Sequence, residues 1–201
     1  MFVIGITGQF ASGKSTVAKI LGRLYRAAVI DADKIGHSVL SDKGVKKRLV
    51  EYFGKRVIVK GAVDRKAIAK LAFANRRSHK ILCGITHPIL VDKIKSKLNG
   101  IESENPKAFV IIDAAVLIEM GLLKVVDKLI VVKLNRAEQI RRAQNKWRLS
   151  PAQITKRIKL QIPASRLFKK ADFIIDNSNN LEDTKKQVKK IRSIVWQKMK
   201  K

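Results

Sequence analysis

Cysteine, acidic residues and long apolar runs are scarce in this sequence. Cys83 is the single cysteine among 201 residues, which excludes a disulfide within the chain and is typical of the reducing cytoplasm. Its apolar neighbours favour a small core side chain over a reactive thiol. No apolar run approaches the roughly 18 residues that a membrane span needs. We therefore expect a cytoplasmic protein with no membrane partner.

The balance of charge is strongly basic, with 44 Lys and Arg against 16 Asp and Glu and a net charge of +28. One interpretation is nucleic-acid binding, in which these residues neutralise phosphates. The other is an enzyme that attracts highly anionic substrates, with most of its lysines on solvated faces. The basic residues are scattered, and aromatic residues make up only 5% of the chain. We favour the enzyme, and we expect non-specific adhesion to RNA rather than a specific nucleic-acid partner.

The strongest pattern is a glycine-rich loop between two apolar segments. Residues 2–6 are a short run rich in branched side chains, which predicts a buried parallel strand. Residues 16–24 carry apolar side chains at helical spacing. Between them lies G-x-x-x-x-G-K-S, the phosphate-binding loop pattern. It consists of Gly8, Gln9, Phe10, Ala11, Ser12, Gly13, Lys14 and Ser15, followed by Thr16.

Each part of this loop has a chemical reason. Gly8 and Gly13 allow a tight turn and a close approach of the backbone to a ligand. The N–H groups of the loop, with the positive end of the following helix, would bind phosphate. Lys14 would reach the β- and γ-phosphates, and Ser15 would hold Mg²⁺ through its hydroxyl. We therefore predict a nucleoside triphosphate site, formed by Gly8, Ala11, Ser12, Gly13, Lys14, Ser15 and Thr16.

Carboxylates follow two further apolar runs. The run 27–30 leads into Asp31 and Asp33, and the run 108–112 ends in Asp113. In open α/β sheets ligands bind at the carboxyl ends of the strands, so these side chains are expected near the nucleotide. If the second strand continues, Asp31 and Asp33 share one face and at least one is a catalytic candidate; the alternative is a helix N-cap. Asp113 is a candidate for holding Mg²⁺ through water.

A long helical stretch separates the second predicted strand from the third. Residues 35–105 carry apolar side chains at helical spacing, and Asp64 is placed to begin one of the helices. Pro88 would kink its helix or begin a new one, which makes His87 part of a corner. His87 is there either a structural residue or a substrate contact. The stretch is too long for a simple crossover, and we expect a lobe that covers the acceptor substrate.

The segment between the fourth and fifth predicted strands, 136–170, is the most basic part of the chain. Glu138 is its one acidic residue. Ser150 as a cap and Pro151 as a first helical residue divide it into two helices. Two basic helices beside a phosphate site predict a lid whose arginines neutralise triphosphate charge. Most of the basic side chains are expected to be solvated; the functional candidates are Arg142, Arg148 and Arg157.

Five short apolar strands with helices between them predict a three-layer α/β/α fold around a five-stranded parallel sheet. The fourth and fifth strands are expected at 128–134 and 172–177. A last helix at 181–201 would bury Leu181, Val188, Ile191 and Val195. We treat 1–201 as a single phosphate-loop kinase domain, with its core at 1–34, 106–135 and 171–201, a helical acceptor-binding lobe at about 35–105 and the lid at about 136–170.

Together these residues resemble one family, the dephospho-coenzyme A kinases, which are phosphate-loop kinases. The similarity covers nearly the whole chain, in the right order. It is carried by Ile6-Thr7-Gly8, Gly13-Lys14-Ser15-Thr16, Ile30-Asp31-Ala32-Asp33, His87-Pro88-Ile89, Leu117-Ile118-Glu119, Arg142 with Arg157 and Gln161, and Ala171-Asp172 to Asp176-Asn177. The phosphate loop alone is common to many kinases, whereas the Asp-Ala-Asp and His-Pro segments together are far more specific.

The resemblance implies transfer of the γ-phosphoryl group of ATP, with Mg²⁺, to the ribose 3′-hydroxyl of dephospho-coenzyme A, the last step of coenzyme A synthesis. It implies that Asp33 is the general base on that hydroxyl. Lys14 and Arg142 would be the other catalytic residues, and Arg148 would join the loop in binding ATP. Substrate contacts would come from Thr7, Asp33, His87, Glu119 and Arg157, and the metal contacts from Ser15 and Asp113.

Two other functions stay open. One is a kinase of the same fold that acts on another small acceptor, such as a nucleoside monophosphate or a sugar acid. The other is a nucleic-acid-binding NTPase, which the charge suggests, although the sequence carries no recognisable RNA-binding module.

Overall fold

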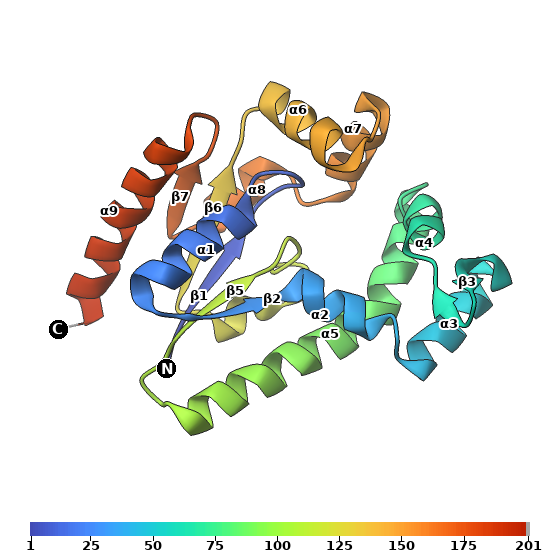
Figure 1. Cartoon of the computed structure of the whole chain (residues 1–201), viewed down its shortest axis with the longest axis horizontal. Helices are drawn as coiled ribbons and strands as arrows, with labels where there is room; N and C mark the ends of the chain where they lie inside the picture. Colours follow the sequence, from blue (N-terminus) through green and yellow to red (C-terminus); the bar gives the residue numbers. More distant parts are fainter. Residues whose placement is uncertain (200–201) are drawn as a thin grey trace. The chain divides into compact units, whose positions relative to one another are not determined.

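The computed structural model describes residues 1–199, and the chain divides into two compact units (Figure 1). The first contains residues 1–31 and the chain from residue 98 onward, and the second contains residues 32–97. The first unit holds β1 (Phe2–Thr7), α1 (Lys14–Tyr25), β2 (Ala28–Asp31), β5 (Phe109–Asp113), the 3-10 helix η2 (Leu122–Val125), β6 (Lys128–Lys133), α6 (Arg136–Trp147), α7 (Pro151–Leu160), α8 (Ala164–Lys170), β7 (Phe173–Asp176) and α9 (Leu181–Met199).

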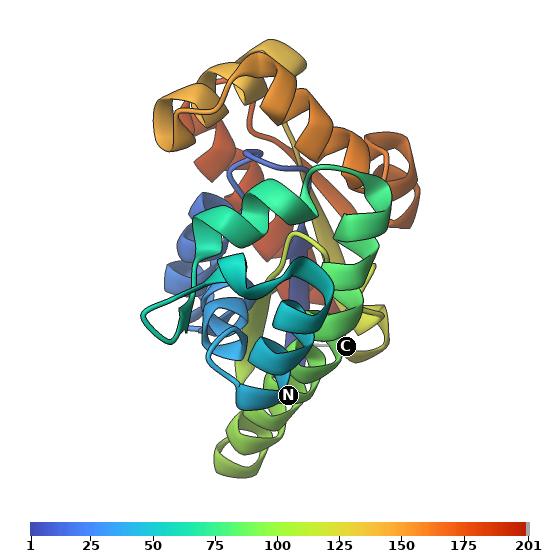
Figure 2. The same cartoon turned by 90° about the vertical axis from the view of Figure 1, so that its right-hand side faces the viewer.

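The second unit is helical apart from a small hairpin, and its elements run from blue to green in Figure 2. It holds α2 (Ala32–Val39), α3 (Lys43–Phe53), the 3-10 helix η1 (Lys55–Val57), β3 (Ile58–Val59), β4 (Ala62–Val63), α4 (Arg65–Ala72) and most of α5 (Arg76–Glu104), whose last turns belong to the first unit.

The five strands of the first unit form one parallel sheet in the order β2-β5-β1-β6-β7, which confirms the predicted fold. β1 lies at the centre and is buried along nearly its whole length, which explains its unbroken apolar sequence. Because the strands run the same way, their carboxyl ends meet at one edge. Thr7, Asp31 and Asp113 all lie at that edge, and Asp31 pairs in register with Asp113.

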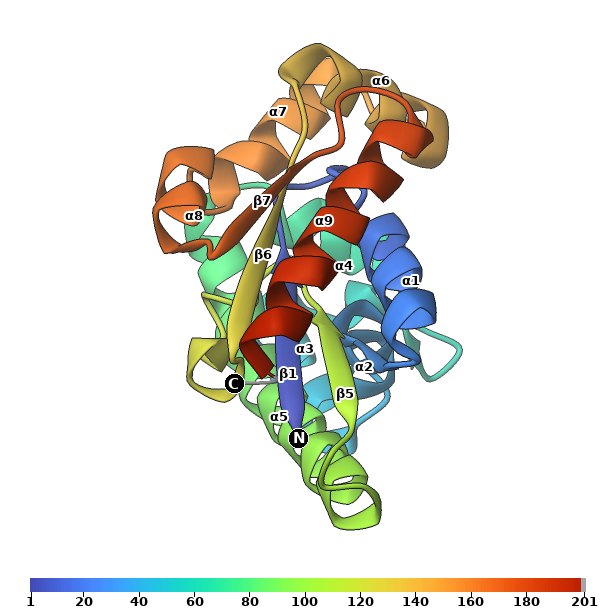
Figure 3. The ribbon, with the colours of Figure 1, turned by 90° about the vertical axis from the view of Figure 1, so that its left-hand side faces the viewer.

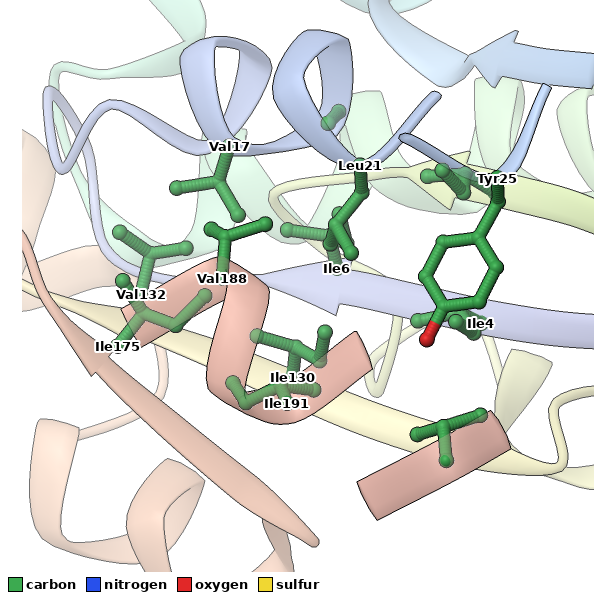
Figure 4. Close-up of a cluster of buried hydrophobic side chains, with 13 residues drawn as sticks. Ile4, Ile6, Val17, Leu21, Tyr25, Ile130, Val132, Ile175, Val188 and Ile191 are labelled. Atoms are coloured by element: carbon green, nitrogen blue, oxygen red, sulfur yellow. The ribbon is translucent and has the colours of Figure 1, made fainter. Parts of the chain in front are cut away.

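Helices α1 and α9 cover one face of this sheet (Figure 3). Alternate β1 residues Ile4 and Ile6 face the helices, where they meet Leu21 of α1 and Ile191 of α9 in one buried cluster (Figure 4). Full burial of each such side chain contributes roughly 1.5–3 kcal/mol. The cluster fixes α1 on β1, and so it fixes both ends of the loop between them.

On the opposite face of the sheet, the chain leaves no room for a side chain at Gly5 of the central strand. A Cβ atom on Gly5 of β1 would lie 2.8 Å from Cδ1 of Leu117 and 3.1 Å from Cγ1 of Val126. The chain that follows β5 therefore packs directly against the backbone of β1. Helix α8 packs against β6 of the same unit, and Leu167 of α8 is buried.

The basic segment 136–170 forms three helices rather than the two predicted. Ser150 caps α7 and Pro151 is its first residue, as expected, and Gln153 completes a capping box by bonding back to the backbone of Ser150. The prediction missed α8, which begins after Pro163. A proline such as Pro163 disfavours continuation of the preceding helix and is compatible with the start of the next, so the sequence does contain a signal for this break.

In the second unit Asp64 caps α4 as predicted, accepting bonds from the backbone N–H groups of Lys66 and Ala67. The predicted corner at His87 is wrong as a helix boundary, because α5 continues through Pro88. Apolar side chains are buried on both sides of the proline, and their packing outweighs the backbone hydrogen bond that proline removes. They are Ile85, Leu90 and Ile94.

Helix α9 accounts for the predicted last helix from Leu181 to Met199; residues 200 and 201 lie outside the described residues. Val188, Ile191 and Val195 are buried as expected. Leu181 is 51% exposed, so its predicted burial is wrong. It is the first residue of the helix, and Thr184, one turn further along, takes the buried position instead.

Candidate active site

The phosphate-binding loop lies between β1 and α1 and has glycine where its backbone requires it (Figure 1). Gly13 has φ of +88°, and a Cβ atom there would lie 2.1 Å from Nδ2 of Asn177. A Cβ atom on Gly8 would lie 2.5 Å from the backbone oxygen of Val132. Ala11 also has a positive φ, of 63°. Left-handed residues within such a loop turn successive N–H groups toward one side, which creates an anion-binding concavity.

The rest of the motif forms the start of α1. Lys14 is half-buried in the first turn, and Ser15 and Thr16 are exposed beside it. A helix N-terminus favours anions, so the cation and the two hydroxyls lie where phosphate binding is most favourable. Ser12 Oγ is buried and, within residues 1–199, has no hydrogen-bond partner. Such an atom is completed by a water or a ligand oxygen.

Two glutamines from the lid segment, residues 136–170, hold Phe10 in the middle of the loop. The N–H of Phe10 donates to Oε1 of Gln161 at 2.7 Å, and Nε2 of Gln139 donates to the oxygen of Phe10 at 2.6 Å. The ring of Trp147 lies 4.6 Å from that of Phe10, and the guanidinium of Arg157 lies 5.4 Å from the Phe10 ring centre. The lid is therefore docked on the phosphate loop.

Arg142 of α6 also lies beside the loop. Its Nη2 donates to the backbone oxygen of Asn177 at 2.9 Å, and its Nη1 would lie 3.4 Å from a Cβ atom on Gly13. Its Nε donates to Oε1 of Glu138 at 2.6 Å. Hydrogen bonds from Arg141 and Arg142 lower the pKa of Glu138 from its ordinary value of 4.5 to about 2. A charged carboxylate thus holds the Arg142 guanidinium next to the loop.

The remaining candidates on this unit differ in their surroundings. Arg157 is half-buried, and burial lowers the pKa of its guanidinium. Glu119 reaches solvent, yet desolvation by its surroundings raises the pKa of its carboxyl, an effect partly opposed by backbone hydrogen bonds from Glu119 itself and Ile162. Arg148 is exposed at the end of α6, where its backbone caps the helix with φ of 51°.

Asp31 and Asp113 lie side by side at the carboxyl ends of β2 and β5. Asp113 is only 6% exposed and Asp31 is half-buried. Within residues 1–199 no three His, Cys, Asp or Glu side chains gather to hold a metal ion. Kinases hold Mg²⁺ with one or two carboxylates together with the phosphates of the substrate. A carboxylate pair on the strand ends and the hydroxyl of Ser15 at the start of α1 therefore have the chemistry that Mg²⁺ requires.

Thr7 was expected to contact the substrate, but its side chain is fully buried. Its hydroxyl donates to the backbone oxygen of Ala115 at 3.2 Å. That bond ties the end of β1 to the turn after β5. The bond holds the two strand ends together, and the role of Thr7 as a substrate contact stays a prediction.

The second unit carries Asp33 and His87. Strand β2 ends at Asp31, so Asp33 does not continue the strand; it lies exposed in the first turn of α2. The condition for a shared face of Asp31 and Asp33 is therefore not met, and Asp33 lies within the first turn of the helix rather than before it as an N-cap. His87 is half-buried in the middle of α5, where burial and the nearby charge of His79 lower the pKa of its imidazole below 6.5.

Four residues that sequence reasoning passed over or named only in passing lie in or beside the loop: Phe10 within it, and Gln139, Trp147 and Asn177 beside it. Asn177 is 5% exposed and its Nδ2 donates to the backbone oxygen of Ser12 at 2.9 Å. An aromatic residue inside a phosphate loop was a readable signal for Phe10. The polar residues carried no such signal.

None of the helices between residues 1 and 199 combines the length and the apolar character that a membrane span requires.

Residues 2–183 match the family model of dephospho-CoA kinase. A dephospho-CoA kinase of Carboxydothermus hydrogenoformans is 34% identical over 188 residues, which cover 92% of this chain and 90% of that protein. The structure of a dephospho-CoA kinase from Campylobacter jejuni aligns with a TM-score of 0.68 and 29% identity over 96% of both chains. A shikimate kinase from Acinetobacter baumannii, at 15% identity, covers 98% of this chain and 94% of its own with a TM-score of 0.57, and shares the fold.

Proposed function

The chain belongs to the dephospho-coenzyme A kinase family, and from this premise we propose that it transfers the γ-phosphoryl group of ATP to the ribose 3′-hydroxyl of dephospho-coenzyme A. The observation that carries the proposal is the phosphate loop, with two obligatory glycines, a half-buried lysine at a helix N-terminus and a lid arginine beside it. This combination binds a triphosphate and neutralises the charge of a moving phosphoryl group.

On the donor side, the loop would grip the β- and γ-phosphates through its N–H groups, while Lys14 and Arg142 oppose the charge that develops on the γ-phosphate. Arg142 is held for this task by Glu138. Arg157 lies over Phe10 of the loop, within the docked lid, and would contact the substrate, and Arg148 at the end of α6 would contribute to the binding of ATP.

On the acceptor side, Asp33 would accept the proton of the 3′-hydroxyl while that oxygen forms its bond to the γ-phosphorus. At the same time the bond between the γ-phosphorus and the β–γ bridging oxygen breaks, and that oxygen leaves as part of ADP. Asp33 is exposed and so is accessible to a substrate, as a general base must be. His87 and Glu119 would contact the acceptor. The lowered pKa of His87 keeps its imidazole neutral near pH 7, so it would do so as a hydrogen-bonding group rather than a cation.

Mg²⁺ would be held by the Ser15 hydroxyl with help from Asp113, through water, and its chemistry there is to neutralise charge on the β- and γ-phosphate oxygens. The residues of the chain would orient the donor, hold the acceptor hydroxyl and keep water away from the γ-phosphate. An open site would otherwise lose ATP to hydrolysis.

The test is a coupled assay of ADP release with ATP, Mg²⁺ and dephospho-coenzyme A, run beside the same mixture without an acceptor. We expect ADP release to depend on dephospho-coenzyme A and to stop when Mg²⁺ is chelated. Enzymatic cleavage of the 3′-phosphate from the product would identify the hydroxyl that received it.

Two results would redirect the assignment. Faster ADP release with another small acceptor, such as a nucleoside monophosphate, would keep the donor site and replace the acceptor. ATP hydrolysis stimulated by RNA, with no turnover of dephospho-coenzyme A, would favour the nucleic-acid-binding NTPase that the +28 charge suggests.

A further inference from the structure

Asn177 connects four parts of the first unit at one point. It follows β7 directly, and its backbone N–H donates to the oxygen of Lys133 at the end of β6. Its Nδ2 donates to the backbone oxygen of Ser12 in the phosphate loop at 2.9 Å. Its Oδ1 accepts a hydrogen bond from the hydroxyl of Thr184 in α9 at 2.8 Å, and its backbone oxygen accepts one from Arg142 at 2.9 Å.

The chemistry of the neighbours fixes the orientation of the Asn177 amide. A backbone carbonyl such as that of Ser12 can only accept, so the group that faces it must be the NH₂. The hydroxyl of Thr184 then donates to the remaining amide oxygen at 2.8 Å, the closer of its two acceptors, since the backbone oxygen of Asn180 lies at 3.3 Å. Asn177 is 5% exposed and Thr184 is 0% exposed, so water cannot replace either bond. An amide turned the other way would place two oxygens against each other in a buried site.

This orientation determines which way the next peptide N–H of the loop points. In a planar trans peptide the C=O and the N–H point in opposite directions. Because Asn177 holds the oxygen of Ser12 on its own side, the N–H of Gly13 points away from Asn177. Gly13 itself accommodates Asn177, since a Cβ atom there would lie 2.1 Å from Nδ2.

We propose that Asn177 is a positioning residue for the donor nucleotide. Through its side-chain amide it sets the Ser12–Gly13 peptide so that the Gly13 N–H meets the triphosphate. Through its backbone oxygen it holds Arg142, whose Nη1 lies near the same glycine. Thr184 acts one step further away, by holding the amide oxygen of Asn177 in place. The inference rests on the proposed function, in which this loop is the ATP site.

The test uses substitutions that remove these hydrogen bonds while they keep the number of side-chain heavy atoms and add no charge. In Asn177→Leu the bond to Ser12 is lost while the branching of the side chain is kept, and we expect Kd and KM for ATP to rise on the order of 10-fold or more. In Thr184→Val the hydroxyl is lost but the shape is kept, and we expect a smaller rise of a few-fold. Thr184→Ser restores the hydroxyl and should restore ATP affinity. Asn179→Leu, on an exposed residue of the same loop, is the matched control and should match the wild type.

Three measurements separate positioning from simple structural support. Binding of ATP, ADP and AMP is compared for each variant, because a misdirected Gly13 N–H should weaken the triphosphate more than the monophosphate. KM for dephospho-coenzyme A is followed beside KM for ATP, and the free energy of unfolding is measured in urea. We expect the ATP values to change and the KM for dephospho-coenzyme A to stay near that of the wild type.

Equal weakening of ATP and AMP, or ATP affinity unchanged in a variant that has lost stability, would make Asn177 structural only and overturn the inference. If Asn177→Leu does not fold, Thr184→Val and Thr184→Ser decide alone, and equal ATP affinity in these two would also overturn it. Absence of ATP binding by the wild-type protein would instead overturn the proposed function, so the two failures can be distinguished.

Discussion

The phosphate loop and the second unit hold their functional candidates in different ways. In the loop, the backbone itself is fixed: bonds from Gln139, Gln161 and Asn177 reach the peptides of Phe10 and Ser12. In the second unit Asp33 is an exposed side chain in the first turn of a short helix. The donor side therefore consists of groups that the fold needs for its own packing, and the main acceptor candidate is a group that the fold does not need.

This difference separates stability from activity. A substitution in the loop changes packing and chemistry together, because the same peptides do both. Replacement of an exposed carboxylate changes chemistry with little effect on folding, since surface substitutions usually stay within about 0.5 kcal/mol. Single substitutions, followed by both activity and stability, distinguish residues of the first kind from residues of the second.

Asp33→Asn should have the largest effect on turnover and almost none on folding. If Asp33 is the general base, kcat should fall by about 10²–10⁴-fold, because asparagine cannot accept the proton. Kd for ATP and the urea midpoint should match the wild type. Steady-state kinetics with dephospho-coenzyme A, nucleotide titration and urea unfolding check these expectations. Near-normal kcat would remove Asp33 from this role.

Lys14→Ala should reduce kcat/KM for ATP by about 10²–10³-fold, the usual cost of removing one group that stabilises transition-state charge. Unlike Asp33→Asn, it should also weaken ATP binding, since Lys14 lies in the loop that holds the phosphates. Lys19→Ala, an exposed lysine further along α1, is the matched control. The two variants differ in position but remove the same charge, so equal activity would show that Lys14 acts only through the overall charge of the chain.

Gly13→Ala should reduce both stability and ATP binding. A residue with a Cβ atom in this left-handed conformation costs about 1–3 kcal/mol, and the new methyl group would displace Asn177. Gly100→Ala is the control, because a Cβ atom there meets nothing within 4 Å and alanine favours the helix. Urea unfolding of both variants measures the difference. Equal stability of the two would mean that the loop is less constrained than its bonds indicate.

The sheet and the loop could be predicted from sequence because their signals are local. The central strands are unbroken apolar runs, and β5 and β6 were each predicted to within one residue at either end. The condition for a shared face of Asp31 and Asp33, a second strand that continues to Asp33, is not met for a tertiary reason. β2 pairs with β5, and β5 ends at Asp113, in register with Asp31, so residues beyond Asp31 have no strand to pair with.

The supports of the loop could not be predicted, because they join residues far apart in the chain. Gln139 is separated from Phe10 by 129 residues, and Asn177 is separated from Ser12 by 165. Gln139 is one polar residue among many, with no spacing that marks it, and Asn177 was named only as the end of a segment that carries the family resemblance, with no role. Only the folded sheet brings the end of β7 next to the loop after β1. The roles assigned to all the site residues stay predictions, those of Lys14, Ser15, Asp113 and Arg142 as much as those of Thr7, Asp33, His87, Glu119, Arg148, Arg157 and the phosphate loop.

The smallest expected effect is on how the free energy of unfolding depends on pH, and it comes from His87 in the second unit. Burial, with the nearby charge of His79, lowers the pKa of His87 below its ordinary value of 6.5. His87 therefore takes up a proton at higher pH in the unfolded chain than in the folded chain. Its contribution to the free energy of unfolding is fully present above pH 6.5 and is lost as pH falls through the lowered pKa. As pH falls from 7, the free energy of unfolding of His87→Gln should decrease less than that of the wild type. His37→Gln, on an exposed residue of α2, should follow the wild type. Urea unfolding across this pH range measures the slopes, and identical slopes for wild type and His87→Gln would show that His87 stays accessible to protons in the folded chain.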